Sequence, residues 1–287
     1  MQLDLTVVSD AVSAAKVSRG DRVLEVGPGT GVLTRALLDA GASVTALEKD
    51  GALAASLVEN NTLLVQSGAL AVVHDDVLRW LRSPSAEGAF PAVSAQAVEP
   101  GSDSGSPPPR RALVVANIPF GISTDLLSLL LPRGDSFSSV TLLVQEEWAQ
   151  RLVVAPPGSP DAREISIRTA FYAPRTRYLR HVPRTCFAPP PGVDCALVRF
   201  DLATTGQWPL PPGDVAPFFS MIRAAFNARR KMLRNTLPGC EALLPQLGLP
   251  LDVRPQQVDM RAYVQLFKAL RAARASDGEQ AVKTAAR

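Results

Sequence analysis

The first half of the chain alternates short apolar runs with segments of helical periodicity, and this alternation restricts the fold more than any other feature. Five runs predict buried strands, at residues 22–26, 43–47, 71–75, 112–117 and 140–145. Intervening segments have the spacing of helices, at residues 31–40, 51–57 and 123–131. Such alternation implies a parallel sheet that is covered on both faces. Ligands in these sheets bind beyond the carboxyl ends of the strands, where we therefore look for chemistry.

The pattern changes after Gln145. Two more strands are predicted at residues 175–182 and 194–201, followed by a hinge at 206–213. A basic helix is predicted at 214–237 and an amphipathic closing helix at 258–273. We therefore expect a first domain at 1–207 and a smaller helical domain at 208–287. Residues 83–109 are rich in Ser, Pro, Gly and Ala without apolar periodicity, which predicts a flexible insertion between two strands.

Composition excludes several classes of protein. With 46% hydrophobic residues among 287, the chain can bury a core, which argues against a disordered protein. It has no run near the ~20 apolar residues of a membrane span, and its first 12 residues do not have the pattern of a secretory signal. The three cysteines form no Cys-x-x-Cys pair, and the two histidines lie far apart. We therefore expect no disulfide framework, no metal site and no catalytic histidine.

Charge is divided unevenly along the chain. Residues 1–150 contain 10 Lys and Arg against 17 Asp and Glu, whereas residues 151–287 contain 20 against 10. This asymmetry favours a second half that faces nucleic acid, although basic helices are often only solvated surfaces. Four cations lie close together at Arg229, Arg230, Lys231 and Arg234. They predict a phosphate-binding patch, with a solvated helix face as the alternative.

A glycine loop follows the first strand, in the sequence Glu25-Val-Gly27-Pro-Gly29-Thr-Gly31. Glycines permit a tight turn and the close approach of a ligand to the backbone. A dinucleotide fingerprint would need a third glycine where Val32 stands, so the spacing favours S-adenosylmethionine instead. The alternative is an ordinary strand-to-helix turn.

Acidic side chains end the next two strands. Glu48 is placed to accept hydrogen bonds from both hydroxyls of a ribose that lies over the glycine loop. Asp75 and Asp76 end the third strand, where a carboxylate can accept from the exocyclic amine of adenine. A solvated acid at Glu48 and a helix cap at the aspartates remain as alternatives.

Two segments combine proline with an aromatic residue. Asn117-Ile118-Pro119-Phe120 follows the fourth strand, where the amide oxygen can accept from a substrate amine and the ring can stack on a base. Phe187 precedes three prolines that can hold it in place. A proline turn with a buried Phe120, and a core position for Phe187, are the alternatives.

Taken together, these segments resemble the ribosomal RNA adenine dimethyltransferase family of the KsgA type, most closely its plastid branch. The matching segments are VLEVGPGTGVLT at 23–34, Glu48, Asp76, NIPFGIST at 117–124, QEEWAQRLV at 145–153, CFAPPPGVD at 186–194 and AFNARRKMLRN at 225–235. The resemblance implies an α/β fold: a Rossmann-like methyltransferase sheet with a small C-terminal helical domain. It also implies a monomer that dimethylates N6 of two adjacent adenosines near the 3′ end of small-subunit rRNA during ribosome biogenesis.

The resemblance assigns roles to individual residues. Gly27, Gly29 and Glu48 would hold the donor S-adenosylmethionine, and Asp76 would take its adenine amine. Asn117 would lie between donor and acceptor. Phe120 and Phe187 would sandwich the target base as part of the catalytic site, and the four cations above would bind RNA.

The chain departs from the family pattern in three places. The family's Gln-Asn-Phe-Leu segment does not occur near Met1, Gly192 replaces a common lysine, and the loop at 155–164 lacks Tyr-Gly. A non-catalytic relative that acts in ribosome assembly or organellar transcription therefore remains the alternative to an enzyme. The expected compartment is the chloroplast, with the mitochondrion or cytoplasm as alternatives.

Overall fold

The computed structural model describes residues 2–93, 110–154 and 159–285. The chain divides into two compact units. One unit consists of Met1–Val154 and Tyr172–Thr204, and the other of Ala155–Phe171 and Thr205–Arg287. The first unit contains the sheet and the second is helical, which agrees with the fold class expected from the sequence.

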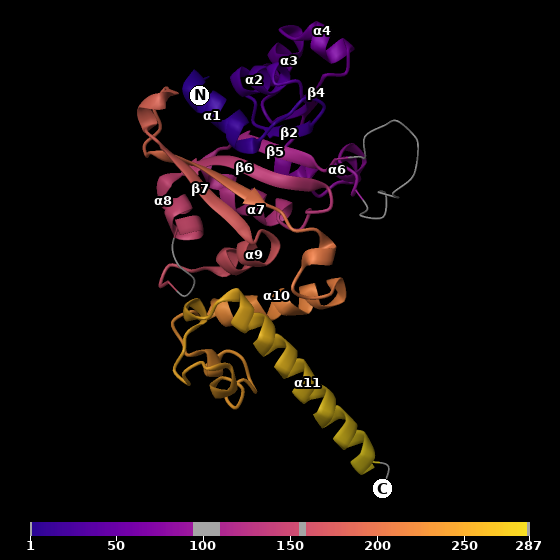
Figure 1. Cartoon of the computed structure of the whole chain (residues 1–287), viewed down its shortest axis with the longest axis vertical. Coiled ribbons are helices and arrows are strands. Elements are labelled where there is room, and N and C mark those ends of the chain that lie inside the picture. The colour runs from indigo at the N-terminus through magenta and orange to yellow at the C-terminus, as the bar shows by residue number, and fades with distance from the viewer. Residues whose placement is uncertain (1, 94–109, 155–158, 286–287) are drawn as a thin grey trace. The chain divides into compact units, whose positions relative to one another are not determined.

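The first unit is built on a sheet of seven strands in the order β4-β3-β2-β5-β6-β9-β7 (Figure 1). The strands span β2 Arg22–Val26, β3 Ser43–Glu48, β4 Leu70–His74, β5 Ala112–Asn117, β6 Phe137–Gln145, β7 Arg175–Val182 and β9 Cys195–Asp201. Strands β2 to β6 pair in parallel, whereas β9 is antiparallel to both β6 and β7. All seven strands predicted from the sequence are present, with bounds that differ by up to three residues.

Helices connect and cover these strands. They are α1 Leu5–Ala15, α2 Val32–Asp39, α3 Gly51–Glu59, α4 Thr62–Gln66, α5 Val77–Trp80, α6 Pro84–Ala89, α7 Ser123–Leu130 and α8 Glu146–Ala149. Asp4 caps α1 by accepting from the Thr6 amide, and Val7 and Val8 bury the helix in the core. A short pair of antiparallel strands, β1 Gln2–Leu3 and β8 Phe187–Ala188, fixes the chain ahead of α1.

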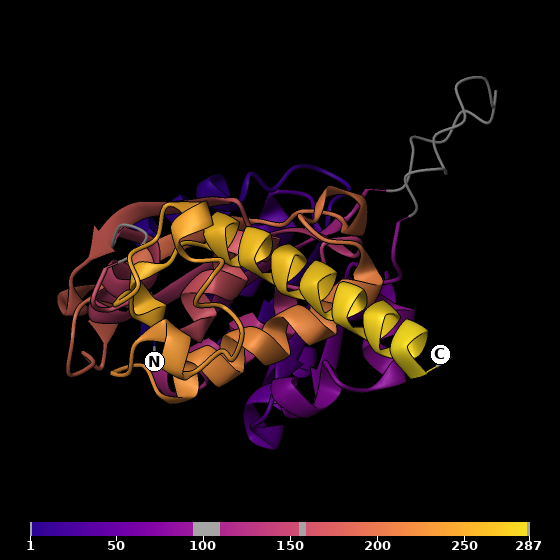
Figure 2. The same ribbon diagram turned by 90° about the horizontal axis from the view of Figure 1, so that it is seen from below.

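The second unit has an aromatic core. Its helices are α9 Glu164–Tyr172, α10 Pro212–Asn227 and α11 Met260–Ala285, and α11 packs beside α10 (Figure 2). Phe171 of α9 stacks on Phe218 of α10 at 5.5 Å between ring centroids, and Phe267 of α11 meets Phe218 at 5.6 Å. The Arg168 guanidinium lies 4.4 Å from the centroid of Phe219. These contacts group residues 159–171 with the second unit, whereas the sequence interpretation assigned them to the first domain.

Two segments differ from the sequence expectation. Within 83–109, residues 84–89 form α6, because Ala86 is buried and Phe90 packs against Phe137 with ring centroids 5.1 Å apart. Residues 94–109 of the expected insertion lie outside the described residues. The helix expected at 214–237 ends at Asn227, so the basic segment that follows is not part of an α-helix, and Arg234 lies in a short 3₁₀ helix at Leu233–Asn235. None of the helices in the described part of the chain is long and apolar enough to span a membrane.

Candidate active site

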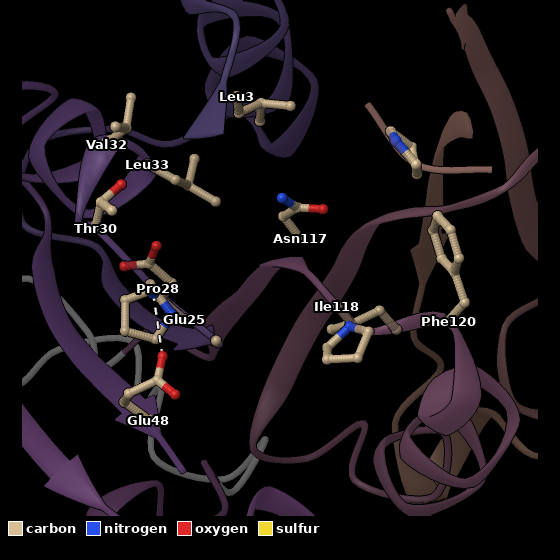
Figure 3. Close-up of a pocket in the computed structure, with 14 residues that line it drawn as sticks. Leu3, Glu25, Pro28, Thr30, Val32, Leu33, Glu48, Asn117, Ile118 and Phe120 are labelled. Carbon is tan, nitrogen blue, oxygen red and sulfur yellow. Dashed lines mark hydrogen bonds between the residues drawn. The ribbon is translucent and has the colours of Figure 1, made fainter. Parts of the chain in front are cut away.

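A cavity of about 350 Å³ lies at the carboxyl ends of β2, β3 and β5 (Figure 3). The glycine loop after β2, Glu48 at the end of β3 and residues 117–120 after β5 supply most of its lining. Its volume falls in the range of roughly 300–1,000 Å³ that is typical of small-molecule sites. The cavity therefore lies where a parallel sheet is expected to bind a ligand.

The glycine loop adopts backbone angles that residues other than glycine disfavour. Gly27 and Gly31 have φ angles of +68° and +82°, in the left-handed region. A Cβ at Gly31 would lie only 2.6 Å from Cδ1 of Leu57, so α2 begins in close contact with α3. At Gly29 no atom lies within 4 Å of the Cβ position, which leaves space for a ligand. Gly27 and Gly29, both predicted as binding residues, line the cavity.

Glu48 is held in place by backbone amides on both sides. One carboxylate oxygen accepts from the Gly29 amide at 3.1 Å, and the other accepts from the Asp50 amide at 2.9 Å. The side chain is only 8% exposed and lines the cavity. Because each oxygen retains a further acceptor position, the carboxylate can still accept from a ligand hydroxyl.

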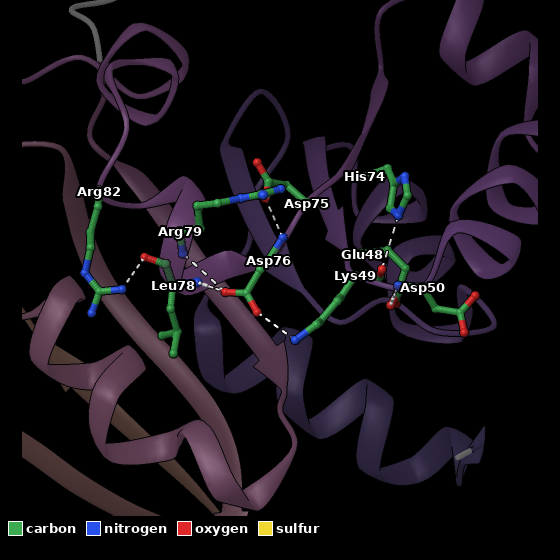
Figure 4. Close-up of polar contacts among 9 residues, drawn as sticks. All are labelled: Glu48, Lys49, Asp50, His74, Asp75, Asp76, Leu78, Arg79 and Arg82. Carbon is green, nitrogen blue, oxygen red and sulfur yellow. Dashed lines mark hydrogen bonds and ion pairs between the residues drawn. The ribbon is translucent and has the colours of Figure 1, made fainter.

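Asp76, by contrast, is not among the residues that line the cavity. Figure 4 shows the polar contacts that it makes instead. Its Oδ1 accepts from the amides of Leu78 and Arg79 and thereby caps α5, which is the alternative considered for this residue. Its Oδ2 pairs with the ammonium of Lys49 at 2.9 Å, and this ion pair lowers the pKa of the Asp76 carboxyl below its usual value. Oδ2 retains a further acceptor position beside Lys49, but no observation places a ligand there, so binding of adenine by Asp76 stays a prediction.

The segment after β5 brings an amide and an aromatic ring to the same cavity. Asn117 ends β5, and Figure 3 shows its side-chain amide directed into the space between the glycine loop and Phe120. Phe120 begins a short 3₁₀ helix, and its carbonyl accepts from the Ser123 hydroxyl at 3.1 Å. The Trp148 indole donates to Thr124 at 3.0 Å, which ties α8 to the start of α7.

Phe187 lies in the core rather than in the cavity. It pairs with Leu3 across the β1–β8 ladder, is 3% exposed and belongs to the same apolar cluster as Val7 and Val8. From the proline-rich loop that follows, it is Pro191 that lines the cavity. Of the two rings expected to sandwich the target base, only that of Phe120 therefore lines the cavity in this structure.

Known proteins are similar to this chain over most of its length. A family model described as "Ribosomal RNA adenine dimethylase" matches residues 3–269. The chain belongs to this family. It is 36% identical over 275 residues to the chloroplastic ribosomal RNA small subunit methyltransferase of Arabidopsis thaliana, covering 93% of this chain and 76% of the relative. It is 34% identical over 274 residues to ribosomal RNA small subunit methyltransferase A of Protochlamydia amoebophila, covering 93% and 88%.

Solved structures share the fold of this chain. The 23S rRNA methyltransferase ErmE aligns with a TM-score of 0.66 at 23% identity, over 93% of this chain and 98% of that one. A dimethyladenosine transferase from Plasmodium falciparum aligns with a TM-score of 0.68 at 21% identity, over 93% and 96%. The Rossmann-like methyltransferase fold with a helical C-terminal part is thereby confirmed.

Sequence analysis assigned no role to Glu25, the acidic residue that precedes the glycine loop. Glu25 lines the cavity at 1% exposure, and neither of its carboxylate oxygens makes a hydrogen bond with the described residues. Burial raises the pKa of its carboxyl to about 8. A single acid in the otherwise apolar strand RVLEV is the sequence signal that points to it.

The basic segment of the dimethylase belongs to the second unit and turns away from the helix axis after Asn227. Arg229 donates to the carbonyls of Pro160 and Ala162 at 3.2 and 3.3 Å, and Arg234 pairs with Glu241 at 3.6 Å. Arg230 and Lys231, in contrast, are exposed and help to line a surface recess. The four cations therefore do not share one helix face, and two of them already have partners.

Proposed function

We propose that this dimethylase transfers methyl groups from S-adenosylmethionine to N6 of two adjacent adenosines near the 3′ end of small-subunit rRNA during ribosome biogenesis. The observation that carries the proposal is the presence of Asn117, Phe120 and Glu48 around one cavity. Two curated relatives, from Arabidopsis thaliana and Protochlamydia amoebophila, are named as small-subunit rRNA methyltransferases, which supports the choice of RNA.

The residues around the cavity fit a donor that carries a ribose and a cationic amino-acid group. Glu48 has acceptor capacity for hydroxyls, and the open side of Gly29 allows close contact with the backbone. The unpartnered carboxyl of Glu25 suits a cation. When bound there, S-adenosylmethionine would supply a sulfonium methyl group that a nucleophile attacks in line, with S-adenosylhomocysteine as the leaving group.

Asn117 and Phe120 would then act on the acceptor. The exocyclic nitrogen of adenine is a poor nucleophile, because its lone pair is delocalised into the ring. If the Asn117 amide oxygen accepts a hydrogen bond from this amine, it favours a tetrahedral nitrogen whose lone pair can attack. The Phe120 ring offers a face for the base once the base has left its stack. Holding the sulfonium methyl group and the adenine N6 at near-attack distance would supply much of the remaining rate enhancement.

Two further elements complete the proposal. We propose that Arg230 and Lys231 bind RNA phosphates, because both are exposed and unpaired among the described residues. We also propose that the protein works in the chloroplast, since one relative of 36% identity is a chloroplastic enzyme. Localisation of a fluorescent fusion of the full-length gene product tests the second point, and a signal confined to another compartment would contradict it.

The experiment for the function uses purified protein, labelled S-adenosylmethionine and small-subunit particles that lack the modification. We expect two dimethylated adenosines per particle, detected by mass spectrometry of digested rRNA. Particles that bind the protein and acquire no label would instead favour a non-catalytic assembly factor. Label confined to DNA or to small amines would contradict the proposed substrate.

A further inference from the structure

The helix α8, at Glu146–Ala149, lies outside the cavity but contacts the base of two loops that line it. It follows β6 directly and packs beside β6, β7 and β9 (Figure 1). None of its four residues is among those that line the cavity. The first loop, residues 117–124, brings Phe120 to the cavity, and the second, residues 183–194, brings Pro191. We call these segments the asparagine loop and the proline loop.

Glu146 joins the two ends of the proline loop. Its carboxylate accepts from the Tyr178 hydroxyl at 2.8 Å and lies 3.0 Å from Nδ1 of His181, both on β7 ahead of the loop. Its amide donates to the carbonyl of Asp194, the last residue of the loop, at 3.0 Å. The Asp194 carboxylate in turn lies 3.6 Å from Nε2 of His181 and accepts from the Arg184 amide at 2.8 Å. The proline loop is therefore closed at its base through the first residue of α8.

The hydroxyl that Glu146 accepts from keeps its proton at neutral pH. Burial is the main reason that the pKa of Tyr178 rises to about 12, and the hydrogen bond to Glu146 and the charge of that carboxylate raise it further. The contact between α8 and β7 is thus a hydrogen bond to a charged acceptor, which is among the stronger kinds.

Trp148, two residues further along α8, holds the asparagine loop. Its indole donates to the Thr124 hydroxyl at 3.0 Å, and its ring meets that of Phe200 on β9 edge-on, with centroids 6.5 Å apart. The preceding residue, Ser123, is 3% exposed and donates its hydroxyl to the Phe120 carbonyl at 3.1 Å. The contacts of Trp148 thereby extend to the backbone of Phe120 through two neighbouring residues.

We propose that Glu146 and Trp148 are positioning residues, which set the separation of Pro191 and Phe120 and so the fit of the acceptor base. The inference rests on the proposed function, because it takes the acceptor to be a base that lies on Phe120. The donor side of the cavity belongs to β2, β3 and the glycine loop, and β5 separates these strands from β6, β9 and β7, beside which α8 packs. A change in α8 should therefore slow methyl transfer and leave donor binding intact.

The experiment compares wild type with Glu146→Ala and Trp148→Phe, a change that keeps an aromatic ring and removes the indole N–H. Because a misplacement of about 1 Å can cost roughly 100-fold in rate, the single-turnover rate on unmodified small-subunit particles should fall about tenfold or more in each variant. Affinities for S-adenosylhomocysteine and for the particle should stay within about twofold of wild type. Hydrogen exchange should become faster in the proline loop for Glu146→Ala and in the asparagine loop for Trp148→Phe.

Two matched variants separate positioning from charge. Glu147→Gln removes a charge from the same helix at a side chain that is 82% exposed and lies 3.6 Å from Arg151, and it should keep the rate of wild type. Glu146→Gln retains a carbonyl oxygen that can accept from Tyr178, and it should recover most of the rate lost in Glu146→Ala. Should Glu146→Ala fail to fold by circular dichroism, Tyr178→Phe removes the same hydrogen bond from the other side and should show the same loss of rate.

The outcomes distinguish the inference from the proposed function. Wild-type rates in Trp148→Phe and in the folded variant of the Glu146–Tyr178 contact would overturn the inference while the proposed function stands. A loss of donor affinity as large as the loss of rate would also overturn it, by assigning α8 a general role in the fold, and so would an equally slow Glu147→Gln. If wild type transfers no methyl group to the particle, the proposed function fails and the inference fails with it.

Discussion

Replacement of Arg230 and Lys231 by alanine separates the RNA contact from the chemistry. Arg229 is held by two backbone carbonyls and Arg234 by Glu241, so two of the four cations in the segment remain exposed. Each phosphate contact contributes roughly 0.7 to the slope of log K against log salt for single-stranded RNA. The double variant should therefore flatten that slope by about 1.4 and weaken binding roughly 25-fold at 0.1 M salt, if the electrostatic contribution vanishes near 1 M.

Filter binding to a 3′ fragment of small-subunit rRNA over a range of salt concentrations gives both numbers. Arg229→Ala is the matched control, since it removes one positive charge from the same segment without removing an exposed side chain. It should leave the slope nearly unchanged and lower the free energy of unfolding by about 1 kcal/mol, because two carbonyls lose their donor. The assignment of Arg230 and Lys231 to RNA binding is refuted if the double variant leaves the slope unchanged. It is also refuted if Arg229→Ala alone changes the slope by half as much as the double variant does.

Two further changes test the donor side of the cavity. Glu48→Ala should weaken the binding of S-adenosylhomocysteine by roughly 1–3 kcal/mol, because the ligand hydroxyls and the amides of Gly29 and Asp50 all lose an acceptor. Unchanged affinity in calorimetry would contradict the role of Glu48. Asp76→Ala should lower the free energy of unfolding by about 1 kcal/mol through loss of the α5 cap. If Asp76 also binds adenine, donor affinity should fall in this variant and not in Lys49→Ala, and equal affinities in all three proteins would show that the residue is only a cap.

The central strands were predictable because they are buried on both faces of the sheet. Val23 and Val114 are completely buried, and runs of such residues are readable without knowledge of the partner strand. The start of β6 at Phe137 was missed because Ser138 and Ser139 follow it, although Ser139 is itself fully buried. Burial of a hydroxyl depends on neighbours that a local pattern does not contain.

The end of α10 was not predictable from local pattern. Residues 228–232 contain good helix formers, so propensity favours continuation past Asn227. Leu233 is completely buried, however, and its amide donates to the carbonyl of Val253 at 2.7 Å. This contact with a residue 20 positions further along the chain turns the backbone away from the helix axis.

The candidate site was predictable where topology alone decides it. Glu48 ends β3 and Asn117 ends β5, the two parallel strands that flank β2, so the positions of both residues follow from strand order. The surroundings of Asp76 and Phe187 depend on contacts between distant residues, namely the ion pair with Lys49 and the ladder with β1. Sequence analysis could name both residues, but it could not decide between the roles considered for each.

The central claim is that Asn117 acts on the reacting amine, and one comparison tests it most directly. Wild type and Asn117→Ala are assayed in parallel for the single-turnover rate of adenosine methylation and for the dissociation constant of the small-subunit particle. Loss of a hydrogen bond that acts in the transition state should lower the rate by roughly 100-fold or more and leave particle affinity within about twofold. Equal losses of rate and affinity would make Asn117 a docking residue, and an unchanged rate would contradict the claim outright.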